Sequence, residues 1–145
     1  MEVKIKKLDS RAKTPVCGSP DAAGADLYAL LDAPLTFAPH ETHMVPTGIA
    51  AAIPENCAGL IFARSSLGSK RGLAPANKVG VIDPDYRGQI MVALHNHSEK
   101  EQTIEPFERI AQLVIVPFVK AEFSVVGELE TTERGEGGFG STGKK

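Results

Sequence analysis

The sequence predicts a small all-β protein, a jelly-roll or barrel-like sandwich with one short helix. The 10 prolines and most of the 14 glycines are spread along the 145 residues, which leaves little room for helices. Short runs rich in valine, isoleucine, leucine and alanine stand between these breaks. Many short strands separated by turn residues are typical of sandwiches, barrels and jelly rolls.

The length and composition fit one domain followed by an arm. A single core organises on the order of 100–150 residues, and 42% hydrophobic with 23% charged residues is ordinary for a globular chain. We therefore expect a jelly-roll domain over residues 1–130. Residues 131–145 are rich in glycine and hold one large apolar side chain, Phe139. We expect them to form a flexible arm that closes over an active site, because they cannot supply a core layer.

The expected elements follow from the apolar runs. Strands are predicted over residues 3–8, 44–53, 58–63, 90–94, 109–119 and 123–129. A short helix is predicted over residues 64–71, because serines suited to an N-cap follow a strand there and a basic pair precedes Gly72.

Charge and hydropathy exclude several classes of partner. The formal net charge is −2 and no run of Lys or Arg exceeds a pair, which disfavours long nucleic acid but not a single nucleotide. No apolar run approaches the roughly 18 residues of a membrane span. Cys17 and Cys57 lie in no disulfide-dense pattern, so we expect free thiols and a cytoplasmic protein.

The glycine-rich segment 135–143 has residues suited to a phosphate. Its glycines let backbone N–H groups approach phosphate oxygens, and Ser141 and Thr142 add hydroxyl donors. The segment lacks the Gly-Lys-Ser/Thr ending of a P-loop. A plain tail is the alternative interpretation, although Phe139 also offers a surface on which a base could stack.

Two further places combine charge with turn geometry. The segment Ala63-Arg64-Ser65-Ser66 brings a guanidinium and two hydroxyls to the start of the predicted helix, which suits a phosphate. A capped helix with a solvent-facing arginine is the alternative. Asp83 before a proline and Asp26 after a glycine each have a purely structural interpretation as turn residues, but either carboxylate could accept a proton from water.

Two further segments of the sequence hold polar side chains in apolar surroundings. His95 and His97 would share one face of a strand, as a metal pair requires, but no third ligand lies at a suitable spacing. A metal site there is disfavoured. Gln112 interrupts an apolar strand and either binds a ligand or faces outward.

Five segments, taken in order, resemble the five motifs of the trimeric dUTP pyrophosphatases (dUTPases). They are Ala-Gly-Ala-Asp-Leu at 23–27, Arg-Ser-Ser-Leu-Gly at 64–68, Gly-Val-Ile-Asp-Pro-Asp-Tyr-Arg-Gly at 80–88, Glu-Arg-Ile-Ala-Gln-Leu at 108–113 and Arg-Gly-Glu-Gly-Gly-Phe-Gly-Ser-Thr-Gly at 134–143. The resemblance spans nearly the whole chain. It implies a jelly-roll subunit, a homotrimer with three sites built from all three chains, and hydrolysis of dUTP to dUMP and pyrophosphate. That reaction limits uracil in DNA and supplies dUMP for thymidylate synthesis.

The resemblance also implies residue roles. Asp83 is similar to the general base that activates water, with Asp26 a second carboxylate near the site that organises water and metal. Mg²⁺ would be held by the triphosphate and waters, without a protein ligand. The implied substrate contacts are Tyr86 to deoxyribose; Asn77, Gly80 and Val81 to uracil; Arg64, Ser65, Ser66 and Gln112 to phosphates; and Arg134, Gly140, Ser141, Thr142 and Phe139 in the closing arm. Ser66 stands where the family more often has glycine, which leaves the role of its hydroxyl open.

Two rival functions remain at this point. A dCTP deaminase resembles this fold, but it would need a different base pocket and would leave the stacking tail unexplained. A non-catalytic jelly-roll regulator would bind a nucleotide through a mobile arm. Pyrophosphate release from dUTP, ammonia release from dCTP, and tight binding without turnover distinguish the three.

Overall fold

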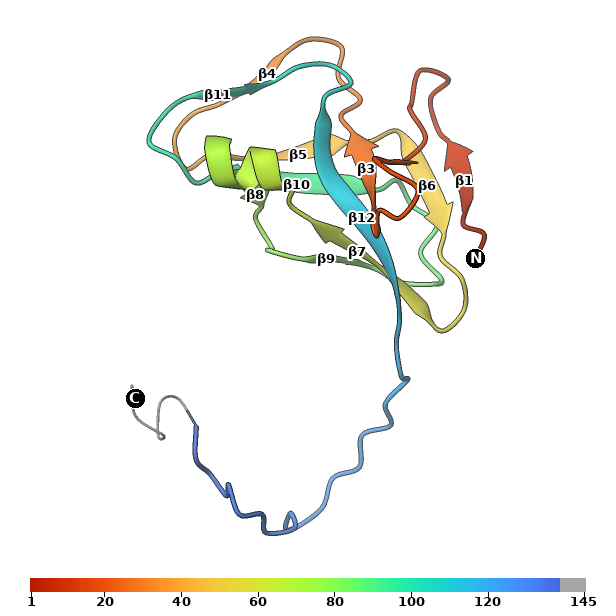
Figure 1. The fold of residues 1–145 in the computed structure, drawn as a ribbon, viewed down its shortest axis with the longest axis vertical. Helices are drawn as coiled ribbons and strands as arrows, with labels where there is room; N and C mark the ends of the chain where they lie inside the picture. Colours follow the sequence, from red (N-terminus) through yellow and green to blue (C-terminus); the bar gives the residue numbers. More distant parts are fainter. Residues whose placement is uncertain (139–145) are drawn as a thin grey trace.

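The computed structural model describes residues 1–138, and in this range it confirms the predicted all-β class with one short helix (Figure 1). All the strand pairings are antiparallel. No helix within residues 1–138 is long and apolar enough to cross a membrane. The strands are β1 (Lys4–Lys7), β2 (Val16–Cys17), β3 (Gly24–Tyr28), β4 (Leu35–Phe37), β5 (Thr42–Pro46), β6 (Ile49–Ala52), β7 (Cys57–Phe62), β8 (Leu73–Pro75), β9 (Gly80–Ile82), β10 (Met91–Asn96), β11 (Gln102–Ile104) and β12 (Arg109–Pro117).

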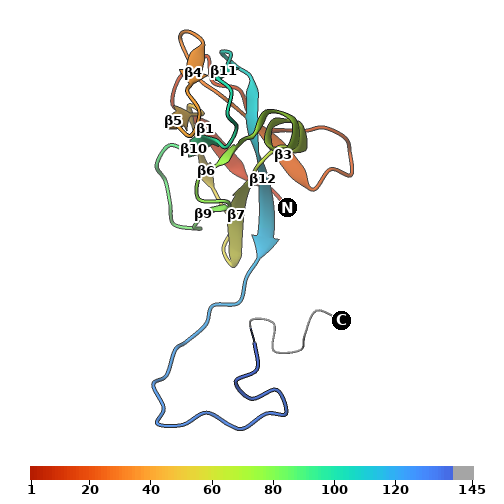
Figure 2. The same ribbon diagram turned by 90° about the vertical axis from the view of Figure 1, so that its left-hand side faces the viewer.

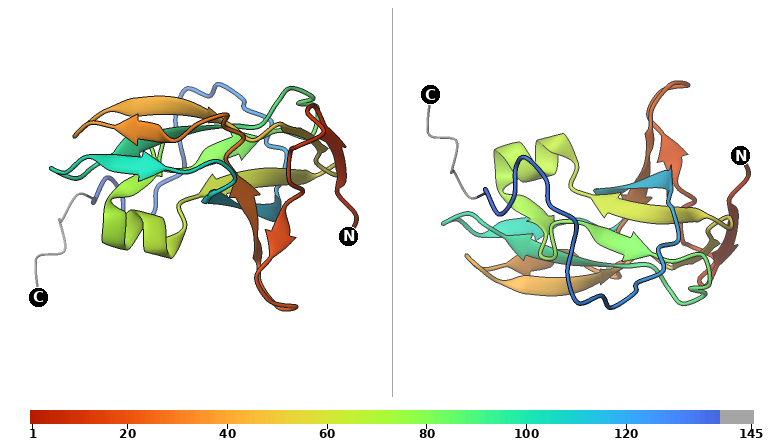
Figure 3. Two further views of the ribbon diagram at one scale, coloured as in Figure 1. Left: turned by 90° about the horizontal axis from the view of Figure 1, so that it is seen from above. Right: turned by 90° about the horizontal axis from the view of Figure 1, so that it is seen from below.

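A five-stranded sheet in the order β2-β3-β12-β7-β9 carries four of the candidate site residues, Asp26, Gly80, Val81 and Gln112. A second sheet, β5-β10-β8, forms another layer, and two-stranded pairs β1-β6 and β11-β4 complete the body (Figure 3). β10 alternates buried and half-buried residues, as expected for a strand with one face on the core. The core is mainly aliphatic, with Phe37 the largest fully buried side chain.

The predicted strand 44–53 is two strands, β5 and β6, separated by a corner at Thr47 and Gly48. Gly48 has φ +70°, a conformation that glycine adopts without strain. A Cβ at this position would lie 2.9 Å from the Cβ of Ala12 and closer still to Leu30. A continuous apolar run therefore conceals a corner that only glycine can form here.

The short helix is confirmed as η1 (Leu67–Arg71), preceded by two helical residues, Ser65 and Ser66. It ends at Gly72, whose φ of +70° and N–H bond to the Leu67 carbonyl form a left-handed cap. Ser66 makes no side-chain cap, contrary to the expectation of a serine N-cap. The hydroxyls at the start of the helix are therefore available for other partners.

The strand predicted over residues 123–129 is wrong. The chain leaves the body after Pro117 and runs as an extended segment without regular structure (Figures 1 and 2). Val119, Phe123 and Val125 are almost fully exposed there. The alternating apolar pattern is that of a strand, but no neighbouring strand within residues 1–138 is present to pair with its backbone.

Candidate active site

Three of the predicted site residues, Asp26, Arg64 and Gln112, meet at the carboxylate of Asp26 on β3. Asp26 is only 4% exposed. Arg64 Nε donates to its Oδ1 at 2.8 Å, and Gln112 Nε2 reaches the same oxygen at 3.4 Å. Arg109 Nη1 donates to Oδ2 at 3.1 Å. Both carboxylate oxygens are therefore occupied by arginine donors, as a buried charge requires.

The strand register explains this meeting of distant residues. Gln112 on β12 lies opposite Asp26 on β3 and opposite Phe62 on β7, so Arg64 emerges beside them just after β7 ends. Gly24 allows β3 to approach closely, because a Cβ there would lie 3.3 Å from the Gln112 Cβ. Residues 38 and 86 positions apart in sequence thus form one cluster.

This cluster suits a phosphate chain. Half of the Arg109 side chain is exposed, as the partner of a solvent-accessible anion should be. Ser65 and Ser66 are exposed at the start of the helix, next to Arg64. Asp26 orients two guanidinium groups whose remaining N–H donors match phosphate geometry. The sequence did not single out Arg109, because its position directly before the buried pair Ile110–Ala111 gives no signal that it reaches Asp26.

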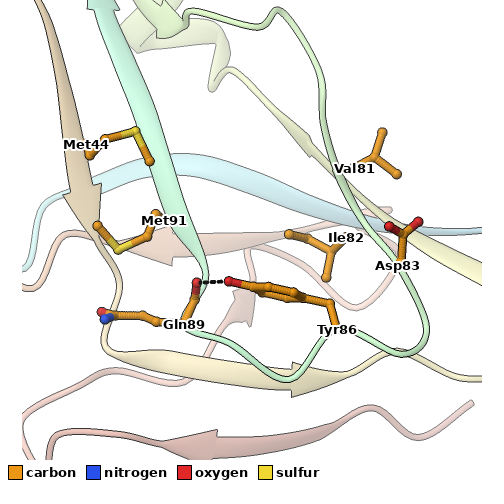
Figure 4. Close-up of a pocket in the computed structure, with 7 residues that line it drawn as sticks. All are labelled: Met44, Val81, Ile82, Asp83, Tyr86, Gln89 and Met91. Atoms are coloured by element: carbon orange, nitrogen blue, oxygen red, sulfur yellow. Dashed lines mark hydrogen bonds between the residues drawn. The ribbon is translucent and has the colours of Figure 1, made fainter.

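A second group of predicted residues surrounds a pocket of about 250 Å³ beside β9 (Figure 4). Asp83 and Tyr86 are the ends of a tight turn, in which the Tyr86 N–H donates to the Asp83 carbonyl at 3.2 Å. The Tyr86 hydroxyl donates to the Gln89 carbonyl at 2.9 Å. The pocket is lined by Met44, Val81, Ile82, Asp83, Tyr86, Gln89 and Met91. A carboxylate and an aromatic ring thus share a half-apolar pocket of nucleoside size.

Asn77 and Gly80 lie on the segment that leads into this pocket. A Cβ on Gly80 would be 3.5 Å from the Asn77 amide nitrogen and 3.3 Å from the Ile61 Cβ, so the Asn77 amide stands beside the bare backbone of Gly80. β9 is the last strand of its sheet within residues 1–138. Its outward backbone groups therefore remain available to pair with a ligand edge.

The two groups lie apart within one chain. β9 runs back along β7, so that Ile82 lies beside Gly59, whereas Arg64 follows the far end of β7. The five residue-to-residue steps from Gly59 to Arg64 span about 16 Å in an extended strand. The Arg64 guanidinium also points toward β3, on the side of β7 opposite β9. One chain does not bring Asp83 to the arginine cluster.

The predicted arm residues lie elsewhere. Arg134 is exposed on the segment that leaves the body, and its Nε donates to the Gly137 carbonyl at 2.8 Å. Phe139, Gly140, Ser141 and Thr142 lie outside the described residues 1–138.

His95 lies near the end of β10, and His97 follows that strand. The rings of His95 and His97 stack edge-on with centroids 4.3 Å apart, and His95 Nδ1 lies 2.7 Å from the Thr42 hydroxyl. Desolvation, followed by the Lys78 ammonium and the neighbouring histidines, lowers the pKa of His97. Within residues 1–138, no three His, Cys, Asp or Glu side chains come together as a metal site.

Comparisons with known proteins show which proteins this chain is similar to. A family model described as dUTPase matches residues 10–143. The deoxyuridine 5'-triphosphate nucleotidohydrolase of Thiobacillus denitrificans is 52% identical, covering 100% of both chains. That of Aeromonas hydrophila is 51% identical over 99% of this chain and 98% of its own. Among solved structures, a mutant dUTPase of Staphylococcus bacteriophage 80alpha with dUpNHpp has a TM-score of 0.88 and 30% identity, covering 98% of each chain.

Proposed function

The chain belongs to the dUTPase family and hydrolyses dUTP, and we propose that water attacks the α-phosphorus to release dUMP and pyrophosphate. Asp83 is the proposed general base. Its exposed carboxylate lines the pocket. It can take a proton from a water held against the phosphate, while positioning and charge neutralisation supply the rest of the catalysis.

The pocket beside β9 is the proposed nucleoside site. Uracil pairs with the outward backbone of Gly80 and Val81 and with the Asn77 amide, where a narrow edge leaves no room for the methyl of thymine. The Tyr86 ring packs on deoxyribose and excludes a 2′-hydroxyl. The contact between Gly80 and Asn77 and the position of Tyr86 across the pocket support these roles.

The Asp26 cluster is the proposed phosphate site. Arg64, Arg109 and Gln112 hold the anion together with the hydroxyls of Ser65 and Ser66. Asp26 acts as a positioning residue, because both of its oxygens already accept arginine hydrogen bonds.

Mg²⁺ fits this site as a companion of the substrate. With its two oxygens engaged by Arg64 and Arg109, Asp26 is a poor direct metal ligand. We infer that Mg²⁺ arrives on the triphosphate and neutralises part of its charge there. The protein side chains then need only orient the phosphates.

A homotrimer with shared sites would unite the two groups. Asp83 and Arg64 lie at opposite ends of β7 within one chain, so a second chain must supply the cluster that meets a given Asp83. The segment after β12 supports an oligomer, because its exposed apolar side chains require cover. These residues are Phe118, Val119, Phe123, Val125, Val126 and Leu129.

The arm is the proposed lid. Arg134, Gly140, Ser141 and Thr142 close over the phosphates and Phe139 covers uracil, which orders the segment when substrate binds. Fifteen residues extend at most roughly 50 Å, so the arm can reach the site of a neighbouring chain. The free cysteines Cys17 and Cys57 support a reducing, cytoplasmic location.

The observation that carries the assignment is the joint presence of Asp83 and Tyr86 in one pocket. The experiment is an assay of purified protein with Mg²⁺ and dUTP, dCTP or UTP, with pyrophosphate and ammonia measured. We expect pyrophosphate from dUTP alone. Ammonia from dCTP would instead support a deaminase, and tight dUTP binding without product would support a regulator.

A further inference from the structure

The Tyr86 ring is fastened, through Gln89, to a corner of the fold that does not itself line the pocket. That corner is Thr47–Gly48, between β5 and β6. The Thr47 hydroxyl donates to the Ile90 carbonyl at 2.6 Å, and the Ile90 N–H donates to the Ile49 carbonyl at 2.8 Å. Thr47 is 2% exposed and Ile90 fully buried, so this anchor is shielded from water.

Gln89 links the corner to the ring through both of its carbonyl groups. Its side-chain Oε1 accepts the Gly48 N–H at 3.0 Å, and its backbone oxygen accepts the Tyr86 hydroxyl at 2.9 Å (Figure 4). The side-chain bond is partly buried and joins residues 41 positions apart. Movement of Gln89 would therefore move the acceptor on which the Tyr86 hydroxyl rests.

Gly88 closes the other side of the ring. A Cβ on Gly88 would lie 2.9 Å from Tyr86 Cε2 and closer still to the hydroxyl. The hydroxyl end of the ring therefore lies close against Gly88. The ring is bonded at its hydroxyl end and one flank is covered, although the side chain as a whole is 42% exposed.

We propose that Gln89 and Thr47 are positioning residues that hold the Tyr86 ring where it excludes a 2′-hydroxyl. This inference rests on the proposed contact of Tyr86 with deoxyribose. A steric filter rejects the larger sugar only if the wall cannot yield, and a half-exposed tyrosine with two free torsions yields easily. The chain from Thr47 through Ile90 and Gln89 supplies the missing rigidity.

The test compares kcat/KM for dUTP and for UTP in two variants that remove one polar group each. Gln89→Met removes the acceptor for the Gly48 N–H at similar length, and Thr47→Val removes the hydroxyl at similar shape. We expect the dUTP/UTP ratio to fall about tenfold in each, the effect of one ordinary hydrogen bond, mainly through better use of UTP. Gln89→Glu keeps an acceptor and should preserve the ratio.

Two controls separate this inference from simple destabilisation and from failure of the proposed function. Thr36→Val removes a hydroxyl bonded to Thr103 on the remote β4–β11 pair and should leave the ratio unchanged. Lower melting temperatures for Gln89→Met and Thr47→Val with an unchanged ratio would overturn the positioning role. Tyr86→Ala tests the underlying assumption: an unchanged ratio in that variant would overturn both the sugar contact and the inference.

Discussion

Asp83 lines the pocket with an exposed carboxylate. Within residues 1–138, none of the hydrogen bonds engages the side-chain oxygens of this carboxylate. Asp83→Asn keeps the size of the side chain but removes its ability to accept a proton. We expect kcat for dUTP to fall by roughly 10²–10⁴ while binding of a non-hydrolysable dUTP analogue persists. Steady-state kinetics and calorimetric titration measure the two effects. A variant with the wild-type kcat would show that another group, Asp26 first, activates the water.

Asp26 has a structural task that its neighbours make measurable. Asp26→Asn would leave the guanidinium groups of Arg64 and Arg109 without their counter-charge, and Arg64 is largely buried. We expect a loss of about 2–4 kcal/mol in the free energy of unfolding, somewhat less than for a fully buried pair because Arg109 is half exposed. Urea denaturation measures it.

The matched control for that loss is Asp21→Asn. Asp21 is exposed in the loop before β3 and should change stability by less than about 0.5 kcal/mol. Equal effects in the two variants would mean that the ion pairs around Asp26 contribute nothing.

The turn after β9 depends on a residue without a side chain. Gly88→Ala would push a Cβ into the Tyr86 ring, so either the ring or the Asp83–Tyr86 turn must shift. We expect kcat/KM for dUTP to fall at least about tenfold, since small misplacements of reacting groups are costly. Gly18→Ala, where nothing lies within 4 Å of the added Cβ, should retain full activity. Full activity in Gly88→Ala would show that the ring position does not matter.

The sequence predicted the long strands and missed the short ones for a physical reason. β12 has nine residues and an apolar run that a pattern reveals, whereas β8 and β9 have three residues each, too few to show a period. The predicted strand over 123–129 has the right pattern but no partner within residues 1–138. Strand formation depends on that partner, which local sequence does not specify.

The candidate site, like the strands, could be predicted from the sequence only in part. Residue types suggested roles for Asp83 and Arg64, because a carboxylate can accept a proton and a guanidinium suits a phosphate, whereas the role of Tyr86 came from the family resemblance. Contacts were not predictable: Arg109 reaches Asp26 only because β12 shifts register between Arg109 and Ala111. Such an irregularity leaves no mark in the apolar pattern.

At the scale of the whole molecule, a single chain keeps the proposed base and the proposed phosphate cluster at opposite ends of one strand. It also leaves its last apolar segment uncovered in solvent. Both features are explained if neighbouring copies cover that segment and bring their clusters to one another's Asp83. We therefore propose that each site is shared between neighbouring chains.

Mixing two inactive variants tests this claim most directly. One is full-length Asp83→Asn, and the other is the chain truncated after Glu133, which keeps Asp83 but lacks the arm. If base and arm come from different chains, co-refolding equal amounts makes about one site in four complete, half of the bases times half of the arms. We expect about a quarter of the wild-type activity from a mixture whose parents are nearly inactive. Differently tagged chains that co-purify, and so have exchanged, yet remain as inactive as their parents would contradict a site whose base and arm come from different chains.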